Sequence, residues 1–241
     1  SEMCIRDRSD IIVLFKSVFR YASREYRIRN VLDGIVLPKK NKPEIAVMNK
    51  KQQLRLEKYL DERPSVTSVG IAISMYMGLR IGEVCALQWK EIDLEKRVLT
   101  VSKTIQRVQC RTGSKQTKLI ITEPKSESSK RTIPIPDCLL PLLRRFKDNG
   151  EVYVVSGRKK PVEPRTMQYR FAKILHNADL PSFHYHSLRH LFATRCVELG
   201  FDVKTLSEIL GHSSVEVTLN RYIHSDMERK RTCMSLLSKC A

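Results

Sequence analysis

The chain has 241 residues, of which 44 are Lys or Arg and 26 are Asp or Glu, so its formal charge is +18 at pH 7. So basic a composition indicates a polyanionic partner, most often nucleic acid. The 7 cysteines include no C-x-x-C pair, which argues against a zinc ribbon or finger, and no apolar run approaches the length of a membrane span. We expect a protein of a reducing cytoplasm that has no membrane contact.

The first part of the chain is predicted to be separate from the rest. Apolar residues from Ile11 to Ala22 recur at intervals of three and four, which predicts a helix with one strongly apolar face. Residues 34–48 combine prolines, a glycine and basic residues without any period, as linkers do. We therefore expect residues 1–33 to be the last helix of a domain whose remainder is absent, and residues 49–241 to form the main domain.

The main domain is predicted to be mixed, mainly α, with a small antiparallel three-stranded sheet. Residues 49–60 and 65–77 are predicted helices, and the second is apolar almost all round, so it should be buried. Gly78 breaks this helix before a short one begins. The predicted sheet is made of three strand-like runs separated by turns, at 97–108, 118–123 and 131–136. Further helices are expected at 137–147, 164–178, 186–199, 202–210, 215–222 and 226–238.

A cluster of histidines and an arginine lies at the start of the helix predicted at 186–199. His186 and His190 are four residues apart and share a helix face, to which Arg189 is close. The spacing could bind zinc, but no Glu lies between the histidines, and a guanidinium beside a dication is repulsive. A phosphate suits the cluster better, because arginine presents a planar fork to its oxygens and histidine can transfer a proton. We expect a structural role for His190 and no role for His184.

Five more positions extend the interpretation of an anion site. Arg80 lies at a helix break among apolar residues, and Glu83 is placed to orient it, although an ordinary first-turn carboxylate explains Glu83 about as well. His212 precedes a helix N-terminus, which favours anions, and Tyr222 follows ten residues later. Lys125 stands in a turn between two strands, where a lysine is usually only solvated but could reach a bound phosphodiester.

Five stretches carry a family resemblance. They are GLRIGEVCALQW, PKSESSKRTIPIP, HSLRHLFATRCVELG, LGHSS and RYIH. In this order they resemble the motifs of the tyrosine recombinase (phage integrase) family, especially integrases of conjugative transposons and temperate phages. The resemblance covers about residues 49–223. It implies the DNA breaking-rejoining fold of the family's catalytic domain for residues 49–241, and it implies that residues 1–33 are a remnant of a core-binding domain.

The resemblance implies a DNA strand transferase that needs no cofactor and no metal. Tyr222 would attack a DNA phosphodiester and form a 3′-phosphotyrosyl bond, which releases a 5′-hydroxyl and conserves the bond energy without ATP. Arg80 and Arg189 would clamp the non-bridging oxygens and stabilise the charge that grows on phosphorus.

The same resemblance implies roles in proton transfer and positioning. Lys125 would protonate the leaving 5′-oxygen, and His186 would be the general base that assists the tyrosine. His212 would hydrogen-bond the scissile phosphate. Glu83 and His190 would support these groups.

The implied partners are double-stranded DNA with core attachment sites and further copies of the chain, which would form a tetramer on DNA. An excisionase or a bacterial DNA-bending protein would be an accessory factor, and the protein would act at the nucleoid of a bacterium. The helix predicted at 226–238 would dock on a neighbouring subunit.

Three alternatives belong to other function classes. A type IB topoisomerase uses nearly the same chemistry to relax supercoils, and a non-catalytic DNA-binding protein would have the charge without needing Tyr222 or Lys125. A zinc hydrolase would explain the paired histidines but lacks a third ligand at suitable spacing.

Overall fold

The chain divides into two compact units, Ser1–Ile45 and Ala46–Ala241. The computed structural model describes residues 2–36, 48–109, 117–123, 130–148, 150–212, 214–216, 218, 231 and 235. The first unit contains helix α1, Glu2–Tyr26, which begins earlier than its apolar periodicity predicts. Phe15 and Val18 of α1 are each 54% exposed. The apolar face of this helix is therefore largely uncovered by the rest of the first unit.

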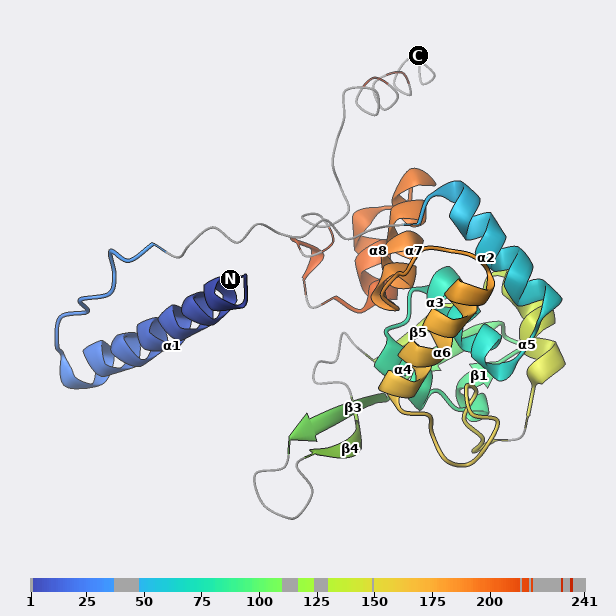
Figure 1. Ribbon diagram of the computed structural model, residues 1–241, viewed down its shortest axis with the longest axis horizontal. Helices are drawn as coiled ribbons and strands as arrows, with labels where there is room; N and C mark the ends of the chain where they lie inside the picture. The colour runs from blue at the N-terminus through green and yellow to red at the C-terminus, as the bar shows by residue number, and fades with distance from the viewer. Residues whose placement is uncertain are drawn as a thin grey trace. The chain divides into compact units, whose positions relative to one another are not determined.

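The second unit is built around helix α3, Val66–Met77 (Figure 1). Almost every residue of α3 is buried, as its continuously apolar sequence predicts, and it contacts the helices before and after the sheets. The hydroxyl of the buried Tyr185 is 2.9 Å from Ser74 Oγ and donates to the Gly70 carbonyl at 3.0 Å, which fixes the entry to α7 against α3. The other helices are α2 Lys50–Glu62, α4 Ile81–Ala86, α5 Leu140–Phe146, α6 Pro164–Asn177, α7 His186–Glu198 and α8 Val203–Leu210, with short 3-10 turns at Trp89–Glu91 and Asp137–Leu139.

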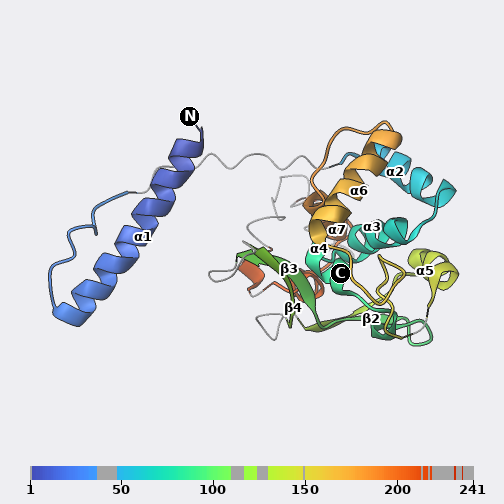
Figure 2. The same cartoon turned by 60° about the horizontal axis from the view of Figure 1, so that its bottom comes forward.

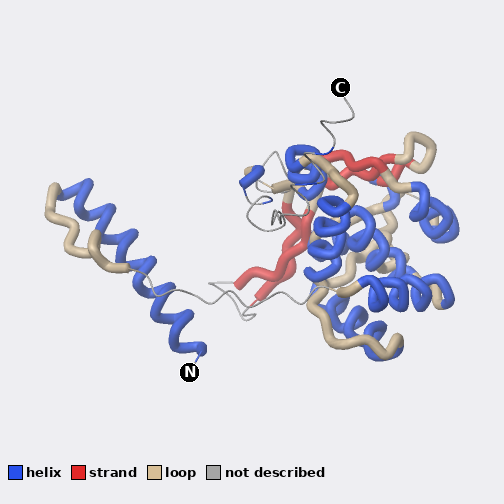
Figure 3. Tube along the Cα trace, turned by 90° about the horizontal axis from the view of Figure 1, so that it is seen from above, coloured by secondary structure: helices blue, strands red, loops and turns tan. Residues whose placement is uncertain are grey.

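The described strands form two antiparallel sheets. One has three strands in the order β1 (Ile92–Asp93), β2 (Val98–Val101) and β5 (Arg131–Pro134), and the other pairs β3 (Thr104–Gln109) with β4 (Thr117–Thr122). Figures 2 and 3 show the β3–β4 pair as a separate sheet. A mainly helical fold with small antiparallel sheets is thus confirmed. The predicted pairing of runs 97–108, 118–123 and 131–136 in one sheet is wrong, because the first run breaks after Val101 and its halves take different partners.

The turn after α3 brings the chain to the candidate site. Gly78 ends α3 in the left-handed conformation, with φ at 69°. A Cβ at this position would lie 2.5 Å from the ring of Phe192, so the turn requires glycine. This position is the helix break that the sequence predicts.

The late helices are described in part. The helices predicted at 164–178, 186–199 and 202–210 are present. Residues 215, 216 and 218 are helical, as are Arg231 and Ser235, whereas the rest of the two C-terminal helices predicted from the sequence lies outside the described residues. Within the described part of the chain, no helix combines the length and apolar character required to cross a membrane.

Candidate active site

The first arginine of the site, Arg80, is held by Glu83. Arg80 occupies the N-cap position of α4, two residues after the left-handed turn. Its Nη1 donates to Glu83 Oε1 at 2.9 Å, and its backbone N–H donates to Glu83 Oε2 at 2.8 Å. The Glu83 side chain is 4% exposed and that of Arg80 is 37% exposed. The orienting contact that the spacing suggested is therefore present, and it leaves part of the Arg80 side chain accessible.

A second guanidinium at the same carboxylate comes from Arg131, which the sequence analysis missed. Arg131 is the first residue of β5, and its Nη1 and Nη2 donate to the two Glu83 oxygens at 3.1 and 2.9 Å. Its side chain is 7% exposed. The alternation in RTIPIP places Arg131 on the strand face that carries the buried Ile133 and Ile135. Since a buried charge needs a partner, this alternation was the signal that could have identified it.

The third arginine, Arg189, is held by main-chain carbonyls. Its side chain is among the largest that are fully buried, with the residue 2% exposed. Its Nη1 donates to the Gly78 carbonyl at 2.8 Å, and its Nη2 donates to the Leu210 carbonyl at 2.7 Å. Arg189 therefore joins three elements, because α7 carries it, α3 ends at Gly78 and α8 ends at Leu210.

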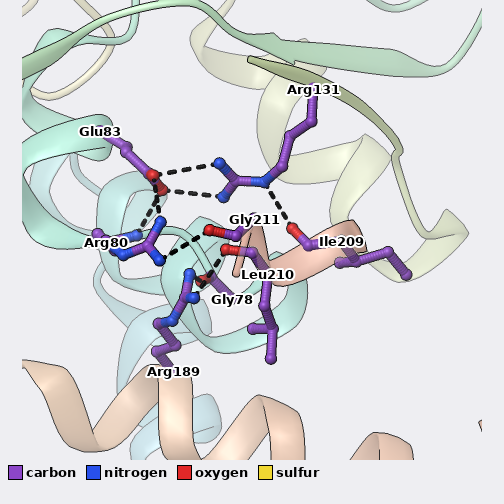
Figure 4. Close-up of polar contacts among 8 residues, drawn as sticks. All are labelled: Gly78, Arg80, Glu83, Arg131, Arg189, Ile209, Leu210 and Gly211. Carbon is purple, nitrogen blue, oxygen red and sulfur yellow. Dashed lines mark hydrogen bonds and ion pairs between the residues drawn. The ribbon is translucent and has the colours of Figure 1, made fainter. Parts of the chain in front are cut away.

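The C-terminal end of α8 brings the three arginines together (Figure 4). Consecutive carbonyl oxygens each accept from a different guanidinium: Ile209 from Arg131 at 2.6 Å, Leu210 from Arg189 at 2.7 Å and Gly211 from Arg80 at 3.0 Å. The last carbonyls of a helix lack intrahelical donors and form the negative end of its dipole. The end of α8 thus orients three guanidinium groups through uncharged carbonyls, which do not neutralise the positive charge as a carboxylate would.

The carboxylate of Glu83 is ionised in this arrangement. Burial raises the pKa of Glu83, but the hydrogen bonds and positive charge of Arg131, and then of Arg80, outweigh burial, so its pKa lies below the ordinary value of 4.5. The cluster of Glu83 and the three arginines therefore contains one negative and three positive charges, so its net charge is positive. Such a cluster suits the binding of a phosphate.

The two histidines of α7 have different environments. His186 and His190 share a helix face, as predicted, and their rings pack edge to face with centroids 4.6 Å apart and planes at 87°. His186, the first residue of α7, is exposed, whereas His190 is 3% exposed. His184 is exposed just before the helix. Among the described residues, no group of three His, Cys, Asp or Glu side chains is placed to hold a metal ion.

His212 follows the arginine cluster directly in the chain. It lies after Gly211, and its Nδ1 is 2.7 Å from Thr218 Oγ1. Thr218 is completely buried, and the sequence analysis did not single it out. Lys125 and Tyr222, the remaining predicted site residues, lie outside the described residues.

Sequence comparisons give a consistent set of relatives. The sequence pattern described as the Phage integrase family matches residues 46–229. A protein named Tyrosine recombinase XerC-like, from Caldanaerobacter subterraneus subsp. tengcongensis, is 30% identical over 92% of this chain and 63% of its own length. The ICEBs1 integrase of Bacillus subtilis is 28% identical over 63% of this chain and 43% of its own length. The chain thus spans less than two thirds of either relative.

Solved structures with the same fold include DNA complexes. The Tn1549 transposon integrase in complex with a circular intermediate DNA has a TM-score of 0.73 and 25% sequence identity, covering 95% of this chain and 78% of that one. A lambda integrase dimer bound to a core site has a TM-score of 0.63 at 17% identity, covering 92% of this chain and 77% of that one. The second likeness concerns the fold alone.

Proposed function

Because the chain belongs to the phage integrase family, we propose that it is a tyrosine-type site-specific recombinase. It cleaves and rejoins double-stranded DNA, and so integrates or excises a mobile element. The observation that carries the proposal is the meeting of three motifs at the end of α8, since Arg80 and Arg189 bind the carbonyls of residues 211 and 210, and His212 comes next. The names of the relatives do not favour the topoisomerase or the non-catalytic alternative.

Arg80 and Arg189 bind and polarise the scissile phosphate in this proposal. Both guanidinium groups are fixed before DNA binds, one by Glu83 and the Gly211 carbonyl and the other by two carbonyls. Donors that are oriented in advance stabilise the charge of a pentavalent transition state without a reorganisation cost. The net positive charge of the cluster supports cleavage without a metal.

Tyr222 is the proposed nucleophile, and its phenol needs help at neutral pH because a free tyrosine has a pKa of about 10. His186 is the proposed general base for this proton, which its exposed position at the start of α7 supports. Lys125 gives a proton to the leaving 5′-oxygen. His212 donates a hydrogen bond to a phosphate oxygen, while its other ring nitrogen is held by Thr218.

The proposal is tested by trapping the covalent intermediate. The protein is incubated with a nicked duplex that carries the core sequence taken from the DNA flanking its gene, so that the cleaved strand diffuses away. We expect an adduct that survives denaturant and maps to Tyr222, and we expect none with Tyr222→Phe. Tyr169→Phe is the matched control, because Tyr169 is 72% exposed on α6 and should leave the adduct unchanged. An adduct that persists in Tyr222→Phe rules out the assignment.

The assembly is proposed to be a tetramer on two DNA sites, with the helix predicted at 226–238 docked on a neighbouring subunit. An excisionase or a DNA-bending protein would direct the reaction at the bacterial nucleoid. Deletion of residues 226–241 should then weaken two-site complexes more than single-site binding in a gel-shift titration. Equal weakening of both would show that the segment packs on its own subunit. The assignment of residues 1–33 to a core-binding domain stays a prediction.

A further inference from the structure

Arg131 has no part in the mechanism above, yet it contacts two of the structures that hold the site. We propose that Arg131 is a positioning residue for DNA cleavage. It fixes the Glu83 carboxylate so that Arg80 is presented to the scissile phosphate, and it fixes the end of α8 that leads to His212. This inference rests on the proposed function, because the positioned group is the phosphate clamp.

The two arginines share Glu83 unequally. Arg131 donates to both oxygens of this carboxylate, whereas the Arg80 side chain donates to Oε1 alone, at 2.9 Å. Arginine and carboxylate groups tend to form bidentate pairs when nothing prevents them. Without Arg131 the Glu83 carboxylate is able to turn toward Arg80 and engage both ends of its fork. The contact of Arg80 Nη2 with the Gly211 carbonyl would then compete with Glu83.

Arg131 also holds the C-terminal end of α8. Arg131 Nε donates to the Ile209 carbonyl at 2.6 Å, which links β5 to a residue 78 positions later in the chain. The next carbonyl, of Leu210, holds Arg189, and the one after it holds Arg80. A displacement of this chain end therefore moves the acceptors of both proposed clamp residues.

The burial of Arg131 favours a positioning role over direct contact with DNA. The side chain of Arg131 is 7% exposed, compared with 37% for Arg80, so it lies behind the carboxylate. Its Nη1 and Nη2 donate to the two oxygens of Glu83, and its Nε donates to the Ile209 carbonyl. A lysine ammonium is a point donor on a flexible stem and does not reproduce this planar arrangement. Arg131→Lys therefore keeps the charge and removes the geometry.

The experiment compares two substrates. One is the ordinary nicked duplex, and the other carries a methylphosphonate at the scissile position, where a methyl group replaces a charged oxygen. The uncharged diester needs less stabilisation from Arg80. Arg131→Lys should slow cleavage of the ordinary duplex by about 100-fold, the size of a misplacement of about 1 Å. On the methylphosphonate the loss should shrink to less than about tenfold, and with Arg80→Lys the two losses should not multiply.

The control is Arg97→Lys, since Arg97 is an exposed arginine that pairs with the exposed Asp137 outside the site. It should cleave at the normal rate. DNA affinity should change by less than about threefold in Arg131→Lys, because no phosphate contact is lost. Equal slowing on both substrates would assign Arg131 a merely structural role, a normal rate would remove any role, and a large loss of affinity would make it a DNA contact.

A second measurement uses the free protein. The Nε–H resonance of Arg80, identified by its loss in Arg80→Lys, should shift in Arg131→Lys and stay in place in Arg97→Lys. An unmoved resonance overturns the positioning proposal whatever the activity. If the unaltered protein forms no Tyr222 adduct, the proposed function fails, and the resonance still decides whether Arg131 positions Arg80.

Discussion

All three arginines donate to carbonyls at the end of α8, but a carboxylate holds the arginines on only one side of the site. On the α4 side, Arg80 and Arg131 share the single carboxylate of Glu83, which neutralises part of their charge while it orients them. On the α7 side, the buried Arg189 donates to the carbonyls of Gly78 and Leu210, which carry only partial charges. A carboxylate orients an arginine but lowers the positive potential around it. Carbonyls at a helix end also orient an arginine, and they leave most of that positive potential in place.

This difference separates orientation from electrostatic stabilisation. Arg80 is partly exposed and oriented, and Arg189 is buried where the dielectric is low, so its charge acts more strongly on a nearby phosphate. In the proposed mechanism one cation of each kind lies beside the phosphate, so the clamp would be rigid and still positive. Substitutions on the two sides of the site test that division.

The largest effect is expected for Arg189. Arg189→Lys should slow single-turnover cleavage by about 10³-fold and Arg80→Lys by about 10²-fold, the two ends of the range for losing one transition-state donor. A lysine at 189 has one nitrogen in place of the two that reach the Gly78 and Leu210 carbonyls, so it does not span both carbonyls and a phosphate. Position 80 retains solvent access and its carboxylate. Both rates are measured on the nicked duplex at saturating protein. A greater loss for Arg80→Lys would reverse the division between the two sides.

The second prediction concerns stability on the α4 side. Glu83→Gln leaves the buried Arg131 without a counter-charge, and breaking such a pair costs about 3 kcal/mol of unfolding free energy. Because the folded pKa of Glu83 is lowered, its contribution is complete above the unfolded value near 4.5 and is lost as pH falls through the lowered folded value. Urea unfolding of the two proteins should therefore differ at pH 7 and converge in acid.

The matched control for this prediction is Asp137→Asn, which removes the exposed partner of Arg97. It should change the unfolding free energy by no more than about 0.5 kcal/mol. If Glu83→Gln is as mild as Asp137→Asn, or if its deficit persists in acid, the carboxylate is not the counter-charge of this side.

The sequence predicted the local half of the site better than the long-range half. The contact of Arg80 with Glu83 is readable because the N-cap and N3 positions of a helix are neighbours whatever the tertiary fold. The contact of Arg131 with Glu83 joins positions 48 apart and depends on where the tertiary fold places β5 relative to α4. The sheets were also hard to predict, because a strand-like pattern does not show with which strand a segment pairs. The run at 97–108 contributes β2 to one sheet and β3 to the other.

The third prediction uses two glycines with the same backbone conformation. Gly211 and Gly157 have φ values of 63° and 61°. Alanine is strained in this left-handed conformation, so either substitution should lower the free energy of unfolding by about 1–2 kcal/mol. At Gly157 the nearest atom to an added Cβ is 3.6 Å away, whereas at Gly211 it is 2.9 Å away and belongs to the Arg131 guanidinium. Gly211→Ala should therefore lose more stability than Gly157→Ala, and it alone should slow cleavage. Equal behaviour would mean that Arg131 and the end of α8 tolerate displacement.

The smallest effect is expected at His212, because the contact tested is with a neutral hydroxyl, that of Thr218. Thr218→Val removes the oxygen that lies 2.7 Å from His212 Nδ1 and keeps the shape of the side chain. One hydrogen bond has a net value of about 1 kcal/mol, so cleavage should slow by about fivefold. Thr218→Ser should restore the rate, and Thr205→Val, at an exposed position on α8, should leave it unchanged.

Because Thr218 is buried, the stability of each variant is measured as well. If Thr218→Val lowers the stability while the folded fraction cleaves at the normal rate, the hydroxyl is only a packing contact. A rate that falls with Thr218→Val and returns with Thr218→Ser would instead place His212 with the arginines, as a third donor whose direction is fixed before DNA binds.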